Sequence, residues 1–86
     1  MSDTKVLFFG RKACKNSAAI AEHLKIKLDN VECCFFENRY DRVPNDLDNW
    51  KGSYVFSFRC PVKIPMHILK SASSAAINFH PAPPNY

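Results

Sequence analysis

Asn78 and His80 stand two residues apart in the segment AAINFHPAPPNY. An asparagine amide donates hydrogen bonds without losing its proton, and a histidine can donate or shuttle a proton near neutral pH. Residues 75–79 read as a short strand, and side chains two apart on a strand point to the same side, so both would face one cleft at its carboxyl end. The spacing also allows a plainer arrangement, in which Asn78 bonds nearby backbone and His80 begins a surface turn before Pro81.

The elements that must position this pair begin with a β-α-β pattern. KVLFF at residues 5–9 is a short apolar run that ends at a glycine, which is typical of a buried parallel strand. Apolar residues then recur at every fourth position and predict an amphipathic helix, which Asn16 or Ser17 caps and which ends near residues 29–30. VECCFF at residues 31–36 predicts the second strand.

The second half of the chain supplies two more strands. YVFSF at residues 54–58 predicts the third strand, and residues 75–79 predict the fourth. A short helix between them is expected to begin at Pro65, because proline suits the first position of a helix. Residues 37–53 are polar and rich in turn-forming residues, so they form a connection with at most one helical turn at residues 46–50.

Together these elements predict an α/β fold, a Rossmann-like and mostly parallel sheet of about four strands with flanking helices. Residues 1–86 leave room for one domain. In such a sheet, ligands bind beyond the carboxyl ends of the strands. We therefore expect the strand at residues 5–9 to be central and its carboxyl end to converge with those of the third and fourth strands on one cleft.

The composition narrows the function classes. Lys and Arg number 12 against 8 Asp and Glu, and without a basic stripe this charge of +4 predicts no nucleic-acid partner. No apolar run approaches the roughly 20 residues of a membrane span, and the start of the chain lacks a secretory signal, so a cytoplasmic protein is expected. The four cysteines lack metal-ligand spacing, so no metal site is expected. The small core leaves room for an oligomer or for a missing C-terminal portion to contribute.

The loop GRKACKNS suggests a second site. Arg11, Lys12 and Lys15 lie close to the backbone N–H groups that open the predicted helix, and together they could hold a phosphate group of a substrate. The loop lacks a glycine-rich phosphate fingerprint, so a solvated loop is the alternative reading.

The segments YVFSFRCPVKIPMHIL and AAINFHPAPPNY resemble the folate-dependent formyltransferases, in which a strand carries Asn-x-His-Pro before a proline-containing turn and an aromatic residue. The resemblance implies transfer of a formyl group from 10-formyltetrahydrofolate to the amine of a small molecule, such as an amino sugar. By matching position, it implies that Asn78 and His80 are the catalytic pair that stabilises a tetrahedral oxyanion. It also implies that Val62, Lys63 and Ile64 form the loop that binds the folate. The alternative is that these residues form a plain strand-to-helix turn.

Two departures from that family affect the expected activity. The family's catalytic Asp lies well beyond its Asn-x-His-Pro motif, and no acidic residue follows Asp48 in this sequence. The connection at residues 37–53 is also shorter than in larger members. The resemblance therefore implies the N-terminal part of a formyltransferase domain that is incomplete as an enzyme. A formyltetrahydrofolate hydrolase and a truncated, non-catalytic binding module are the alternatives.

Overall fold

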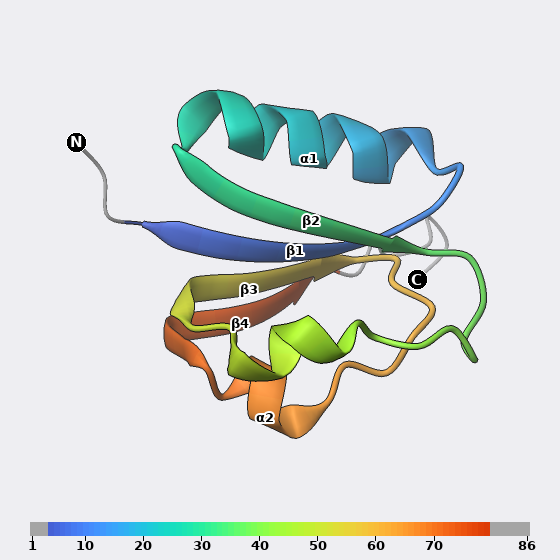
Figure 1. Ribbon diagram of the computed structural model, residues 1–86. Helices are drawn as coiled ribbons and strands as arrows, with labels where there is room; N and C mark the ends of the chain where they lie inside the picture. The colour runs from blue at the N-terminus through green and yellow to red at the C-terminus, as the bar shows by residue number, and fades with distance from the viewer. Residues whose placement is uncertain (1–3, 80–86) are drawn as a thin grey trace, which may run out of the picture.

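The computed structural model describes residues 4–79 and shows an α/β fold (Figure 1). Four strands form one sheet in the order β2-β1-β3-β4, and each neighbouring pair is parallel, as predicted. The elements in chain order are β1 (Lys5–Arg11), α1 (Lys15–Lys27), β2 (Asn30–Phe36), the 3₁₀ helix η1 (Asn45–Asn49), β3 (Gly52–Phe58), α2 (Met66–Leu69) and β4 (Ala72–Phe79).

The helices form layers on both faces of the sheet. Helix α1 lies along β1 and β2 on one face, whereas η1 and α2 lie on the other (Figure 1). The chain leaves β1 toward β2 on one side and later places β3 on the other side of β1, so the strand order reverses between β1 and β3. Ligands of open parallel sheets bind beside such a reversal, at the carboxyl ends of the strands.

The side chains of β1 explain why its sequence is apolar throughout. Leu7 and Phe9 pack toward η1 and α2 in a cluster that includes Leu47, whereas Phe8 packs toward α1 with Ala21. Because both faces of this central strand are covered, polar side chains in its middle would be buried without water, and apolar side chains are favoured. Val6, Leu7, Phe8 and Phe9 are all 0% exposed.

Two helix starts differ from the prediction. Helix α1 begins at Lys15, with Cys14 at the capping position and no side-chain cap, so the predicted cap by Asn16 or Ser17 is wrong. Ser17 lies inside the first turn and is completely buried. Its hydroxyl forms hydrogen bonds with the backbone of the strands and does not cap the helix. Pro65 is the capping residue of α2 and not its first helical residue, and the helix is four residues long.

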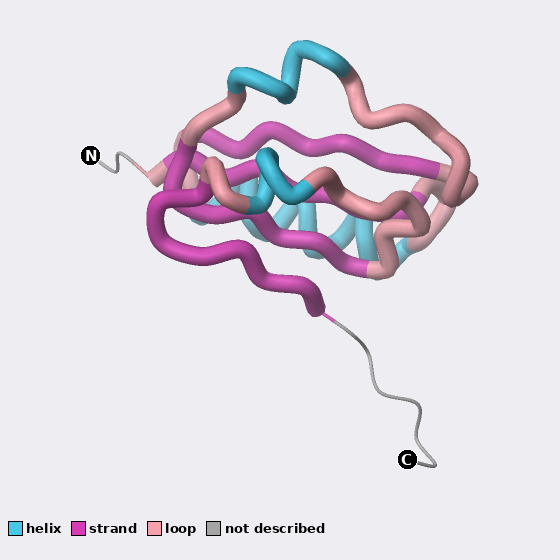
Figure 2. The backbone as a smooth tube through the Cα atoms, turned by 90° about the horizontal axis from the view of Figure 1, so that it is seen from below, coloured by secondary structure: helices cyan, strands magenta, loops and turns pink. Residues whose placement is uncertain are grey.

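Strand β4 forms an open edge of the sheet, and Figure 2 shows no element beyond it among residues 4–79. Its pairing with β3 has an irregularity between Gly52 and Tyr54, and the strand starts at Ala72, three residues before the predicted start. Ile77 and Phe79 remain 40% and 44% exposed, because the described helices leave this part of the α1 face uncovered. No helix within the described residues is long and apolar enough to cross a membrane.

Candidate functional site at the carboxyl ends of β3 and β4

Asn78 lies near the carboxyl end of the edge strand β4, directly beside Ser57 of β3. The Ser57 hydroxyl donates a hydrogen bond to Asn78 Oδ1 over 2.9 Å. Ser57 is 6% exposed, whereas Asn78 is exposed, so a buried hydroxyl from the sheet contacts the amide of a surface residue. This contact gives the predicted site residue Asn78 a defined neighbour on the adjacent strand.

The loop that follows β3 forms the opposite wall of the same site. Val62 is buried against the η1 and α2 side of the core, and the Cys60 thiol donates a hydrogen bond to the Val62 carbonyl over 3.4 Å. Lys63 is exposed and Ile64 is partly buried, so the loop is anchored at Val62 and open beyond it. Two prolines at positions 61 and 65 restrict the backbone on either side.

Asn78 and this loop line one pocket of about 580 Å³, together with Ser57, Cys60 and the α2 segment. The structure therefore brings four of the predicted site residues together, namely Asn78, Val62, Lys63 and Ile64. His80, the fifth residue of this predicted site, lies outside the described residues. The volume falls within the range of small-molecule pockets.

The electrostatics of this pocket are simple. Lys63 is the single charged side chain among its lining residues. Burial raises the pKa of the Cys60 thiol, so this thiol stays protonated near neutral pH. Apolar walls with an amide, a hydroxyl and one ammonium group suit a ligand that has apolar parts, hydrogen-bonding groups and a negative charge.

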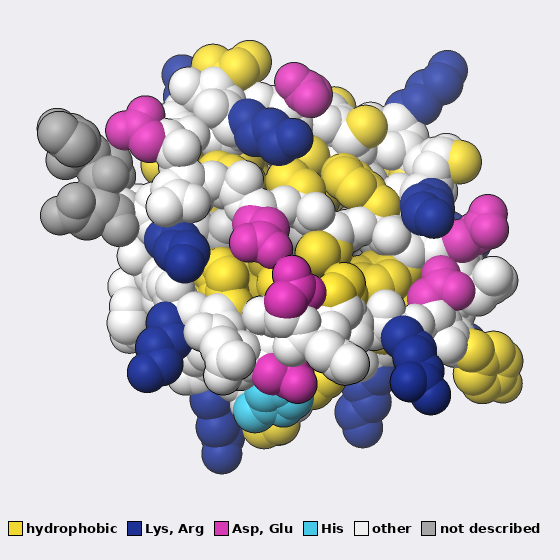
Figure 3. Space-filling view, in the orientation of Figure 1, with side chains coloured by type: hydrophobic (Ala, Val, Ile, Leu, Met, Phe, Trp, Pro, Cys, Tyr) yellow, Lys and Arg dark blue, Asp and Glu magenta, His cyan; other side chains and the backbone are white. Residues whose placement is uncertain are grey.

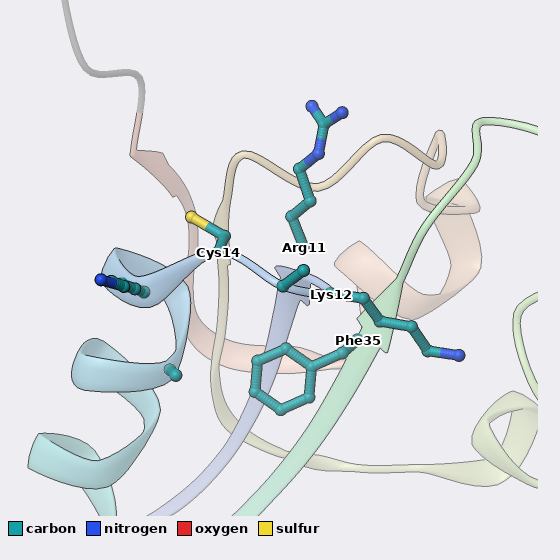
Figure 4. A pocket seen from close by; sticks show the side chains of 7 residues that line it. Arg11, Lys12, Cys14 and Phe35 are labelled. Carbon is teal, nitrogen blue, oxygen red and sulfur yellow. The ribbon is translucent and has the colours of Figure 1, made fainter.

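Arg11 and Lys12 line a different pocket, which has a volume of about 540 Å³ and lies between the loop after β1, the start of α1 and Phe35. Their side chains extend in different directions, and the ring of Phe35 lies below both in the view of Figure 4. The two pockets share no lining residue. The predicted convergence of three strand ends on one cleft therefore holds for β3 and β4 and is wrong for β1, whose end contributes to the other pocket.

Ser17 is the residue that sequence reasoning did not assign correctly. Its hydroxyl accepts a hydrogen bond from the Arg11 N–H over 3.2 Å and donates one to the Phe58 carbonyl over 3.3 Å. It therefore connects α1 to the carboxyl ends of both central strands. The signal is present in the sequence, because Ser17 lies four residues before Ala21 and seven before Leu24 and so falls on the buried stripe of the helix.

Cys14 is set apart from the other cysteines by its surroundings. The Ser17 hydroxyl and the backbone N–H groups at the start of α1 lower its pKa, and the Arg59 guanidinium contributes in the same direction. Burial raises the pKa of Cys33 and raises that of Cys34 to about 11. These two neighbours lie in the two core clusters on opposite faces of the sheet, as their adjacency on β2 predicts.

Charged side chains are spread over the surface that the structure describes. Lys and Arg are dispersed among acidic and neutral side chains on the face that Figure 3 shows. Within residues 4–79, no group of three or more His, Cys, Asp or Glu side chains could hold a metal ion. Comparisons with protein-family models, with curated proteins and with solved structures find no match for this chain.

Proposed function

We propose that this chain forms the donor-binding part of a formyltransferase, which moves a formyl group from 10-formyltetrahydrofolate to the amine of a small molecule such as an amino sugar. The observation that carries the proposal is the pocket in which Asn78 faces the loop at residues 62–64. The sequence resemblance identified both segments without the structure, and the short helix α2 lies between them along the chain. Their meeting in one pocket supports a common ligand.

The pocket suits the two ends of such a donor. The backbone of the loop at residues 62–64 offers N–H and C=O groups to a pterin-like ring, and the apolar walls bury the faces of that ring. Lys63 supplies a positive charge at the exposed side of the loop, where the carboxylates of a folate can reach it. In this arrangement the formyl group lies on the side of Asn78.

The proposed reaction explains the residue types. The acceptor amine attacks the formyl carbon, and the tetrahedral intermediate carries a negative oxygen that Asn78 stabilises through its amide N–H group. His80 takes the proton that the amine loses and returns it to the folate nitrogen, and the bond from the formyl carbon to that nitrogen breaks as it is protonated. Removing one donor to such an oxyanion commonly slows the reaction by about 10²–10³. The role of His80 rests on the sequence motif.

Arg11 and Lys12 are proposed to hold a phosphate group of the acceptor. Arg11 ends β1 and Lys12 begins the loop after it, beside the reversal of strand order where acceptor and donor would meet. Replacing both with Ala should weaken binding of a phosphorylated acceptor and leave folate affinity unchanged. Equal loss of both ligands would contradict this assignment.

The proposal is tested by titrating the isotope-labelled chain with a stable folate analogue, using NMR chemical shifts and calorimetry. Shift changes are expected to concentrate at residues 57, 60–66 and 78, and Asn78→Ala should weaken binding, whereas the matched surface variant Asn38→Ala should not. We expect weak binding without measurable formyl transfer by the 86-residue chain, because no acidic residue follows Asp48. Shift changes confined to the Arg11 pocket, or binding that Asn78→Ala leaves unchanged, would refute the proposal.

A further inference from the structure

We propose that Ser57 is a positioning residue, which orients the Asn78 amide toward the ligand in this pocket. The inference rests on the proposed function for the role of that amide. It adds a residue on the neighbouring strand that holds the catalytic group in place.

The geometry of the pair supports this role. Ser57 and Asn78 are directly opposite each other in the parallel register of β3 and β4, and both line the pocket. The hydroxyl donates to Asn78 Oδ1 over 2.9 Å, which is a good hydrogen-bond distance. A hydrogen bond at Oδ1 restricts rotation of the amide group and keeps its Nδ2 end farther from Ser57 than its Oδ1 end.

The asymmetry of burial indicates which residue holds the other. Asn78 is exposed on an edge strand, where the terminal torsion of an asparagine side chain has a broad range of allowed angles. Ser57 is almost completely buried in β3, so its own side chain has little freedom. A buried donor with little freedom restricts the exposed amide that it contacts, and such restriction is what preorganised donors require.

The sequence of β3 also singles out Ser57. Its neighbours Val55, Phe56 and Phe58 are apolar, and Ser17 and Ser57 are the two buried polar residues in the described part of the chain. A buried hydroxyl is unfavourable unless it has a hydrogen-bond partner. The Ser17 hydroxyl donates a hydrogen bond to strand backbone, whereas the Ser57 hydroxyl donates one to a side chain that lines the pocket.

The test compares two ligands and three variants. The ligands are a hydrolysis-stable deaza analogue of 10-formyltetrahydrofolate that keeps the formyl group, and the matching analogue without it. Ser57→Ala is expected to weaken binding of the formyl analogue by about 2- to 12-fold, the factor that corresponds to one neutral hydrogen bond, and to leave the other analogue unchanged. Ser57→Thr keeps the hydroxyl and should restore binding, and Ser53→Ala at the other end of β3 is the matched control.

A second measurement does not depend on folate binding. The side-chain amide signals of Asn78, assigned by their loss in Asn78→Asp, should shift and become more mobile in Ser57→Ala and should be retained in Ser57→Thr. Unchanged Asn78 signals in Ser57→Ala would overturn the inference, as would equal weakening of both analogues, since that pattern indicates a structural role. If neither analogue binds the unmodified chain, the proposed function fails, and the amide signals alone decide whether Ser57 positions Asn78.

Discussion

Replacing Ser17 with Ala tests the hydrogen bonds that connect α1 to the two central strands. The variant removes an acceptor for the Arg11 N–H and a donor to the Phe58 carbonyl, and the Ser17 side chain is completely buried. Each neutral hydrogen bond contributes about 0.5–1.5 kcal/mol to stability. The distances of 3.2 and 3.3 Å are long, so the lower half of that range applies to each bond.

The expected loss follows from these contributions and one opposing effect. Alanine is a better helix former than serine, so the substitution stabilises the helix by at most about 0.7 kcal/mol. The Phe58 carbonyl and the Arg11 N–H, however, lose partners in a part of the structure that water reaches poorly, which adds a desolvation cost. We expect Ser17→Ala to lower the free energy of unfolding by about 1–2 kcal/mol. For a domain of this size, that corresponds to a fall in melting temperature of about 4–16 °C.

Chemical denaturation followed by circular dichroism measures this change, with Asn16→Ala as the matched control in the same helical turn. Asn16 is exposed and α1 has no side-chain cap, so its replacement should change stability by less than about 0.5 kcal/mol. A capping asparagine would instead cost about 1 kcal/mol when replaced. The reasoning is refuted if Ser17→Ala unfolds like the unmodified protein, or if Asn16→Ala is the more damaging of the two.

Three further predictions concern packing, thiol chemistry and pH. Gly52→Ala should destabilise the fold by about 1–3 kcal/mol in urea unfolding, because its added carbon would lie 2.5 Å from the buried Trp50 ring and 2.8 Å from the backbone carbonyl oxygen of Lys5. Gly10→Ala should cost less, because its added carbon would meet only side-chain atoms, the nearest at 2.9 Å. Cys14 should react with iodoacetamide before the other three cysteines in mass spectrometry, since its pKa is lowered and theirs are raised, and the reverse order would contradict this. The carboxylate of Asp41 accepts hydrogen bonds from two backbone N–H groups, and these lower its pKa below 3.8. The turn it holds should therefore persist on acidification to pH 3.8 and loosen as the pH falls through the lowered pKa. The NMR chemical shifts of the Glu37 and Asn38 amides report this change, and a transition in them above pH 3.8 would count against the prediction.

The sequence predicted the type and order of the elements better than their limits. The apolar runs of the strands are a direct signal of burial, and the parallel pairing followed from the helices and connections between them. Strands β3 and β4 begin at Gly52 and Ala72, earlier than predicted. The residues at these starts are small or polar, so no apolar run marks them, and they are extended because they pair with neighbouring strands. The predicted cap of α1 was wrong for a related reason. The Ser17 hydroxyl bonds to Arg11 and Phe58, which only the folded chain brings close to it.

The candidate site was predictable in part. Asn78 and the loop at residues 62–64 could be found because one motif covers two segments joined by a short connection, so adjacent parallel strands bring them together. The separation of Arg11 and Lys12 into another pocket depends on strand order and on the direction of side chains, which periodicity does not specify. The contact of Ser57 with Asn78 was not predicted, because the role of a serine within an apolar strand depends on its partner on the neighbouring strand.

The backbone gives a further reason to place function at the carboxyl ends of the central strands. Ala13 and Arg59 adopt the left-handed conformation, with φ values of 57° and 53°, and neither is a glycine. Ala13 follows β1 and Arg59 follows β3, so both strained residues flank the reversal of strand order. Such conformations cost roughly 1–2 kcal/mol each and persist only where surrounding contacts determine them. The Ser17 hydroxyl supplies such contacts, because it binds the Arg11 N–H and the Phe58 carbonyl immediately before these two loops turn. Strain held by these hydrogen bonds fixes the course of the loops, and fixed loops are what the proposed site at these strand ends would require.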